Sequence, residues 1–293
     1  MQLIVQPEHG LDPILRTILR ARRSIDVCIF RLDRGAIERA LADAVKRGVR
    51  VRALNAQPES GAAPRKVEER LLAAGITVAR APDELLRYHS KFMLVDDTLH
   101  LYAFNFTKRD ILKSRSFGIA TRDRRTVQEA LKLFEADSTH QPYVPSPSNL
   151  VISPDNARRS LGQFIQGSRR ELAIYDDRIH DRQMIELLKL RAHGGVRIRV
   201  IGKMKKPGDG IEVRPLRKNR LHVRAIIRDG ARAFVGSQSL RTLELDRRRE
   251  VGLMIHSAQV THALMEVFEF DWLLSAEAKE DRPVVVEDAA APG

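Results

Sequence analysis

Two short stretches of this sequence pair a histidine with a basic residue two positions later. His89 and Lys91 are followed by Asp96, and 133 residues on, His222 and Arg224 are followed by Asp229 at the same spacing. One such pattern is weak, because it occurs often by chance and would serve equally to cap a strand. Two copies at equivalent places indicate shared chemistry.

One chemistry that two such copies could perform is phosphodiester cleavage through a covalent intermediate. One side of the phosphorus requires a nucleophile, and the leaving oxygen on the other side requires a proton donor. Two imidazoles can fill these roles if one is neutral while the other is protonated. Lys91 and Arg224 would then neutralise the non-bridging oxygens as charge builds up. We expect no metal or other cofactor, because no convincing His/Cys/Asp ligand cluster is present.

The elements that carry these residues are predicted by an internal repeat. Residues 3–30 align with 150–177 at a constant offset of 147, and the same offset places GVRVR at 48–52 over GVRIR at 195–199. Downstream of the motifs, SFGIAT at 116–121 aligns with EVGLMI, at an offset of 134. The chain is therefore predicted to contain two copies of one unit.

Hydrophobic periodicity predicts the order of elements in each unit. In the first, strands are expected at Leu3–Val5, Ile25–Phe30 and Val49–Leu54, and amphipathic helices at Ile14–Arg22 and Ile37–Val45. Strands alternating with crossover helices predict an α/β fold: two tandem domains with mainly parallel central sheets.

The domain boundary is expected in the stretch ADSTHQPYVPSPSN, which is rich in Pro, Ser and Asn. This composition predicts an N-terminal domain over residues 1–138 and a C-terminal domain over 148–277. Residues 278–293, charged and then rich in Ala and Pro, are predicted to be a disordered tail.

Composition narrows the class of protein. The net charge is +13 and the pI is near 10.3, which favours a polyanionic partner such as an anionic phospholipid or nucleic acid. No apolar run is long enough to span a membrane, and the N-terminus does not read as a signal peptide. The single Cys28 lies in an apolar run. We therefore expect a cytoplasmic protein, with possible peripheral contact to the membrane.

At the paired motifs the chain resembles the phospholipase D superfamily, whose signature is His-x-Lys-x4-Asp followed by Gly-Ser-x-Asn. The resemblance implies two pseudo-twofold related domains, an active site at their interface, and a metal-independent phosphodiesterase or phosphatidyl transferase related to cardiolipin synthases. It implies His89 as the nucleophile that forms a phosphohistidine and His222 as the acid and base. Because both motifs lie in one chain, a monomer can suffice.

The second part of the signature is imperfect in both copies. The first reads Tyr-Ala-Phe-Asn and ends at Asn105, and the second reads Gly-Ser-Gln-Ser and contains Ser237 and Ser239. These three side chains are the expected phosphate-binding donors. The family also has an acid about 28 residues after the histidine, which orients an imidazole. Glu250 fits that position, whereas its counterpart in the first half is Ser116. Asp96 and Asp229 are expected to hold the junction between strand and turn.

Three functions remain open at this stage. The first is a phosphodiesterase or transferase acting on phospholipid, the preferred reading, and the second is a nuclease of the same superfamily. The third is a non-catalytic phosphate or nucleic-acid binder, suggested by Arg224, Ser239 and Ser116. A phospholipid site needs an apolar entrance, whose candidates are Leu85, Leu86, Tyr88, Tyr102, Phe104 and Phe106, although Phe104 and Phe106 fit an ordinary core better. The basic residues 214–224 could contact either polyanion.

Overall fold

A computed structural model describes residues 1–55, 62–82 and 87–277. The first half consists of β1 (Gln2–Gln6), α1 (Asp12–Arg20), β2 (Ser24–Ile29), α2 (Gly35–Lys46), β3 (Arg50–Asn55), α3 (Ala62–Ala73), β4 (Thr77–Arg80), β5 (Arg87–Tyr88), β6 (Phe92–Val95), β7 (Thr98–Tyr102), α4 (Lys108–Lys113), β8 (Ser114–Thr121) and α5 (Arg124–Ser138). The second consists of β9 (Leu150–Ser153), α6 (Ala157–Gln166), β10 (Glu171–Ile179), α7 (Arg182–His193), β11 (Arg197–Met204), β12 (Ile211–Arg214), β13 (Arg220–Leu221), β14 (Arg224–Arg228), β15 (Arg232–Gly236), α8 (Thr242–Asp246), β16 (Arg248–Ile255) and α9 (Ala258–Glu277).

The two halves have the same sheet topology. The first sheet runs β1-β8-β7-β6-β2-β3-β4, and the second runs β9-β16-β15-β14-β10-β11-β12. Each strand of one sheet therefore has a counterpart at the same place in the other. The predicted α/β fold with two related units is confirmed, and the five elements predicted in the first half lie within two residues of those observed.

The prediction of mainly parallel sheets was wrong, because each sheet is mixed. Within the seven-strand order of each sheet, only β2-β3-β4 and β10-β11-β12 pair in parallel. Crossover helices α2, α3 and α7 connect these neighbours, except for β11 and β12, between which no helix lies. The strand after each motif forms a hairpin with the next strand, β6 with β7 and β14 with β15, and the rest of each sheet continues antiparallel. The sequence pattern predicted the parallel strands correctly where crossover helices connect them. It did not predict the antiparallel hairpins, which form at the tight turns of Asp96 and Asp229.

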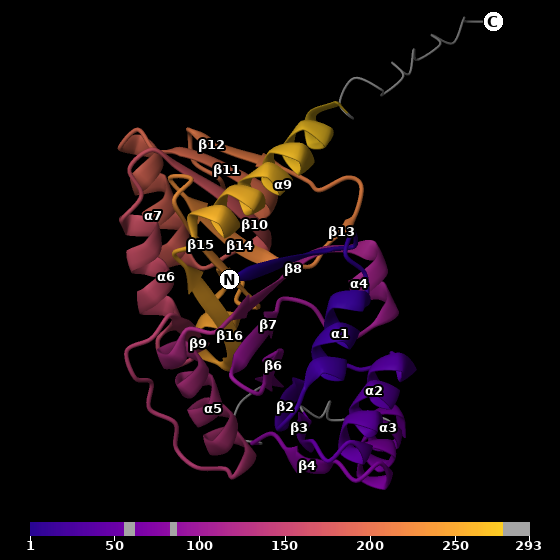
Figure 1. Ribbon diagram of the computed structural model, residues 1–293. Helices are drawn as coiled ribbons and strands as arrows, with labels where there is room; N and C mark the ends of the chain where they lie inside the picture. Colours follow the sequence, from indigo (N-terminus) through magenta and orange to yellow (C-terminus); the bar gives the residue numbers. More distant parts are fainter. Residues whose placement is uncertain (56–61, 83–86, 278–293) are drawn as a thin grey trace, which may run out of the picture.

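The hydrophobic core has three parts. Helices α1 and α2 pack on the outer side of the first sheet, and α6 and α7 on the outer side of the second, as Figure 1 shows. Between the two sheets lies a third cluster with side chains from both halves, such as Phe117, Tyr175 and Trp272. The halves are joined by a shared apolar core, which fixes the position of one half relative to the other.

Each half also adds a short strand to the sheet of the other half. β5, which precedes the first motif, pairs in parallel with β16, and β13, which precedes the second motif, pairs in parallel with β8. The exchange is reciprocal, as a pseudo-twofold relation requires. It brings both motifs to the interface between the halves.

Two expectations fall outside the described residues. They are the disordered tail at 278–293 and the contribution of Leu85 and Leu86 to an apolar entrance. Helix α5 ends at Ser138 and β9 begins at Leu150, so the first three residues of the predicted boundary stretch belong to α5 and residues 139–149 contain no helix or strand.

Candidate active site at the interface between the halves

Both motif histidines lie where the chain crosses from one sheet to the other. His89 follows β5 and precedes β6, and its backbone N–H donates to the carbonyl of Arg249 in the other half at 2.8 Å. His222 lies between β13 and β14, and its N–H donates to the carbonyl of Arg115 at 3.2 Å. His89 and Lys91 both lie between β5 and β6, outside either strand. The crossing itself positions the imidazoles between the halves.

The motif cations lie beside the histidines. The Lys91 ammonium donates to the carbonyl of His89 at 2.7 Å, and the Arg224 guanidinium pairs with Asp177 at 2.7 Å. Burial lowers the pKa of Lys91 to about 7, and the positive charge of Arg224 contributes to this shift while Glu250 opposes it. Arg224 also acts on His89, which belongs to the other half. The two motifs therefore share one electrostatic environment.

Glu250 contacts the first histidine from the opposite half. Its Oε2 lies 2.8 Å from His89 Nδ1, and its side chain is completely buried. Burial raises the pKa of Glu250 to about 7, although Lys91 pulls it down. Burial, followed by the positive charges of Lys91 and Arg224, holds the pKa of His89 well below its usual value. His89 is accordingly a neutral imidazole whose Nδ1 faces a carboxyl group, which leaves Nε2 free to react.

Asp110 occupies the corresponding place next to the second histidine, and sequence analysis missed it. Its Oδ2 lies 3.4 Å from His222 Nδ1, at ion-pair distance but outside hydrogen-bond alignment. Asn105 donates to the same oxygen at 2.6 Å, and Arg220 contacts Oδ1 at 2.8 Å. Burial opposes ionisation of Asp110, but His222 and these donors hold its pKa below the ordinary value. Each histidine thus has a carboxyl partner from the opposite half.

The sequence did carry a signal for Asp110. At the offset of 134 that relates the segments after the motifs, Asp110 aligns with Glu244, so an acid is present in both halves. Ser116, the counterpart of Glu250, contacts the second histidine through the backbone instead: its hydroxyl donates to the carbonyl of His222 at 3.0 Å. The carboxylate that Ser116 lacks is supplied by Asp110, six residues earlier, at helix α4.

Burial lowers the pKa of His222 as well, but with a different balance of charges. After burial, the largest influence is Asp110, which favours the protonated imidazole and opposes Arg224 and Arg220. No carboxylate acts in this way among the leading influences on His89. The two imidazoles therefore differ in the charges that act on them: Asp110 favours the protonated form of His222, whereas cations are the leading charges at His89.

The expected phosphate-binding residues are close to the motifs but engaged with other groups. The Asn105 amide donates to Asp110, and the Ser239 hydroxyl donates to the carboxylate of Asp176. The Ser237 hydroxyl contacts the backbone of Val251 in the neighbouring strand at 3.3 Å. All three side chains are buried. Their role as phosphate donors stays a prediction.

Asp96 and Asp229 lie at equivalent turns. The Asp96 carboxylate accepts hydrogen bonds from the backbone N–H groups of residues 22–24, and Asp229 accepts from residues 169–171, at the repeat offset of 147. Both have positive φ, 50° and 55°. The geometry fits the structural role expected for them: each ties the hairpin turn to the start of a neighbouring strand.

We expect Asp96→Ala to lower the free energy of unfolding by about 2 kcal/mol, because three backbone donors lose a charged acceptor and Ala is strained at positive φ. Asp97→Ala is the control: its carboxylate pairs with Arg23 on the surface at 82% exposure and should change stability by less than about 0.5 kcal/mol. Urea denaturation of both variants measures the difference. Equal stability of the two variants would contradict the assigned role.

The expected apolar entrance is not formed by the described candidates. Tyr88, Tyr102, Phe104 and Phe106 are all at most 5% exposed and belong to the core. The prediction that Phe104 and Phe106 belong to the core is confirmed. The prediction that the two tyrosines line an apolar entrance was wrong. They are buried because the strands that carry them are covered on both faces.

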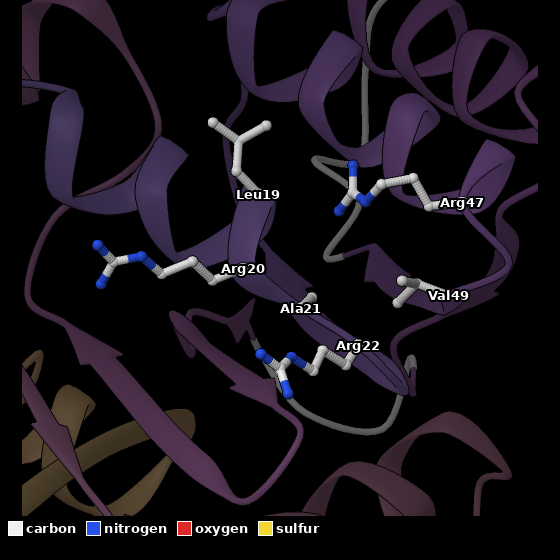
Figure 2. Close-up of a pocket in the computed structure, with 6 residues that line it drawn as sticks. All are labelled: Leu19, Arg20, Ala21, Arg22, Arg47 and Val49. Carbon is white, nitrogen blue, oxygen red and sulfur yellow. The ribbon is translucent and has the colours of Figure 1, made fainter.

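A surface hollow of about 620 Å³ lies elsewhere, at the C-terminal end of α1 and the start of β3. It is lined by Leu19, Arg20, Ala21, Arg22, Arg47 and Val49, none of which belongs to a motif. Figure 2 shows that the guanidinium groups of its three arginines lie apart from one another.

Two further searches covered the described part of the chain. No group of three or more His, Cys, Asp or Glu side chains is arranged to hold a metal ion there. Within the same residues, no helix is both long and apolar enough to cross a bilayer.

Comparisons with known proteins match this chain to a family and to relatives whose descriptions name cardiolipin. The family model described as "Cardiolipin synthase, PLD-like domain" matches residues 14–138. A mitochondrial cardiolipin hydrolase of Xenopus tropicalis is 32% identical over 151 residues, which are 51% of this chain and 70% of that protein. A mitochondrial cardiolipin hydrolase of Danio rerio is 29% identical over 159 residues, and the match spans 66% of its length.

A solved structure extends the likeness to both halves. Polyphosphate kinase from Porphyromonas gingivalis superposes with a TM-score of 0.78 at 18% identity, over 92% of this chain and 50% of that one. At this level of identity the likeness concerns the fold. The two-unit α/β arrangement is therefore shared over almost the whole chain.

Proposed function

This chain belongs to the phospholipase D superfamily, and on that premise we propose that it cleaves phosphodiester bonds through a covalent phosphohistidine, with phospholipid as the preferred substrate. One observation carries the proposal most strongly. The two motif histidines are held at the interface by the opposite half, and each faces a carboxyl group, Glu250 or Asp110, across that interface. Two oriented imidazoles from two related units are what a two-step displacement at phosphorus requires.

The first step is attack by His89. Its Nδ1 is held by Glu250, so the lone pair on Nε2 attacks phosphorus and the bond to the leaving oxygen breaks. His222 donates its Nε2 proton to that oxygen, and Asp110 stabilises the protonated imidazole before this transfer. Lys91 and Arg224 neutralise the non-bridging oxygens. The product of this step is a phosphohistidine on His89 and a free alcohol.

The second step reverses the roles at His222. The imidazole, now neutral, removes a proton from a water or an alcohol, and the oxygen attacks the phosphohistidine. The bond between phosphorus and His89 breaks, which restores neutral His89 and protonated His222. Water gives hydrolysis, and an alcohol gives transfer.

Phospholipid is preferred because of the relatives. Both the family model and the curated relatives carry cardiolipin in their descriptions. The surface offers one matching feature: Phe270 and Leu273 of α9 are 50% and 62% exposed, and Lys218 lies over the Phe270 ring at 5.8 Å. Exposed apolar side chains next to a cation suit contact with an anionic bilayer surface. We accordingly propose a peripheral protein that works at the cytoplasmic face of a membrane, as a monomer.

Purified protein should be incubated with vesicles of phosphatidylglycerol or cardiolipin and, separately, with single- and double-stranded DNA and with RNA, at two salt concentrations. We expect release of phosphatidic acid or an exchanged lipid, and no nucleic acid cleavage. Turnover of nucleic acid alone would replace the lipid proposal by the nuclease. That alternative is favoured by the net charge of +13. No turnover of any phosphodiester would favour a non-catalytic binder.

The pH dependence follows from two shifted groups. Burial raises the pKa of Glu250 to about 7, so its carboxylate, which must accept the Nδ1 proton of His89, is lost as the pH falls below neutrality. Burial lowers the pKa of Lys91 to about 7, so its positive charge is lost as the pH rises. We expect kcat/KM to have a maximum close to pH 7 and to fall on both sides.

The variant Lys91→Arg distinguishes the acidic fall of kcat/KM from the alkaline fall. Arg stays charged at all accessible pH values, and the second motif already has Arg at this place, so the variant should lose the alkaline fall while keeping the acidic one. Profiles of kcat/KM between pH 5 and 9 for wild type, Lys91→Arg and the exposed control Lys113→Arg test this. An alkaline fall at the same pH in all three proteins would show that another group causes it.

A further inference from the structure

The surroundings of His89 contain more positive charge than one phosphodiester needs. Phe30, directly after β2, packs edge-on against the His89 ring, with ring centroids 4.5 Å apart. Around the same Phe30 ring lie the Arg87 guanidinium at 4.6 Å, the Lys91 ammonium at 5.2 Å and the Arg31 guanidinium at 5.5 Å. Lys91 belongs to the motif, whereas Arg31 and Arg87 have no place in the mechanism above.

A third arginine joins them from the other half. Arg248 on β16 is the direct pairing partner of Arg87 on β5. Its guanidinium contacts Glu244 at 3.0 Å, but Glu244 also pairs with Arg241 at 3.3 Å, so one carboxylate serves two cations. Burial and then the charges of Arg248 and Arg31 lower the pKa of Arg87, which is the expected result of three guanidinium groups close together.

Within the described residues, the cluster of Arg31, Arg87 and Arg248 is only partly neutralised, by Glu244 at Arg248. Among residues 1–55, 62–82 and 87–277, no carboxylate forms an ion pair with Arg31 or Arg87, and Arg248 Nε is buried without a hydrogen-bond partner. Like charges held together without counter-charge cost free energy, and an anion between them removes that cost.

The other half shows what a neutralised version looks like. The counterpart of Arg87 is Arg220, at the motif offset of 133, and it is paired with Asp110 at 2.8 Å. The counterpart of Phe30 is Asp177, at the repeat offset of 147, and it pairs with Arg224 at 2.7 Å. The charges therefore differ between the two related sides of the site. On the His222 side Arg220 and Arg224 are each paired with a carboxylate, whereas on the His89 side no carboxylate of the described residues pairs with Arg31 or Arg87.

We propose that Arg31, Arg87 and Arg248 form a binding site for a second phosphate group of the substrate, next to the phosphodiester that is cleaved. This inference rests on the proposed phosphodiesterase function and narrows its substrate class to phosphodiesters with a further phosphate. A lipid with two phosphates and a nucleotide chain both offer this chemistry.

The binding test does not depend on turnover. Isothermal titration compares propane-1,3-diol bisphosphate with propyl phosphate in wild type, Arg31→Gln, Arg87→Gln and the control Arg159→Gln, an exposed residue of α6 outside the cluster. We expect wild type and Arg159→Gln to bind the bisphosphate about tenfold or more tightly than the monophosphate, and the ratio to fall towards one in the two cluster variants. A ratio that is unchanged in both cluster variants would overturn the proposal, even if the protein cleaves phosphodiesters.

The kinetic test identifies the source of the second phosphate. In one arm, kcat/KM for cardiolipin is compared with that for phosphatidylglycerol in matched vesicles. In the other, the p-nitrophenyl ester of thymidine 5'-phosphate is compared with the same compound carrying a 3'-phosphate. A preference for the second phosphate in the lipid arm alone assigns a diphosphate lipid, and one in the nucleotide arm alone assigns a nucleotide chain. No preference in either arm refutes the subsite, and no turnover at all refutes the proposed function while the titration still decides the subsite.

Discussion

His89→Asn is expected to reduce phosphodiester turnover on the order of 10³-fold or more, because asparagine keeps a polar group at this place but removes the nucleophile. The fold should be unaffected: the backbone N–H of His89 that donates to Arg249 is retained in the variant. Initial rates with a p-nitrophenyl phosphodiester measure the loss directly.

His262→Asn is a matched control for this variant. Its side chain is 76% exposed on α9, remote in sequence from both motifs, and its rate should equal that of wild type. Activity of His89→Asn within tenfold of this control would mean that His89 is not the nucleophile.

Asp110→Asn is expected to lower turnover by about 10²-fold, through His222. The variant removes the charge that favours the protonated imidazole, while an amide oxygen can still accept from Asn105. Proton donation matters for an alkoxide leaving group and hardly at all for p-nitrophenolate. In rapid-mixing experiments, the first turnover should therefore slow strongly with an alkyl diester and little with a p-nitrophenyl diester.

Asp33→Asn is the control for Asp110→Asn. Asp33 also contacts helix α4, since its carboxylate accepts from the Lys108 N–H at 2.8 Å, but it is exposed and is not paired with a histidine. Its rates should match those of wild type. If Asp110→Asn slowed both leaving groups equally, its role would be to hold α4 in place rather than to act on His222.

Much of the fold could be predicted from local patterns. The repeat at offset 147 located the strands and helices of both βαβ units, because their apolar faces alternate with a clear period. The hairpins after each motif could not be identified as antiparallel, since a short apolar run such as Phe92–Val95 has the same pattern in either orientation. The exchanged strands β5 and β13 have only two residues each, too few for any periodicity.

The candidate site was predictable where a residue type repeats and not where a contact depends on the fold. Glu250 could be identified from its spacing, but the histidine that it contacts could not. Only the structure shows that this histidine is His89 and not His222, which is nearer in the sequence. Asp110 was missed because the expected position for an acid held Ser116. The charge difference between the two sides of the site becomes visible only in the contacts of the described residues, where Arg220 is paired with a carboxylate and Arg87 is not.

The most direct test of the central claim is to trap the covalent intermediate. A substrate labelled with ³²P in the scissile phosphate is mixed with wild type and with His222→Asn at pH 7, quenched in base, digested and mapped by mass spectrometry. We predict the label on His89 in both proteins, with greater accumulation in His222→Asn, because loss of the base blocks the second step. Label on His222 in wild type, or turnover by His222→Asn at the wild-type rate without any labelled histidine, would contradict the account.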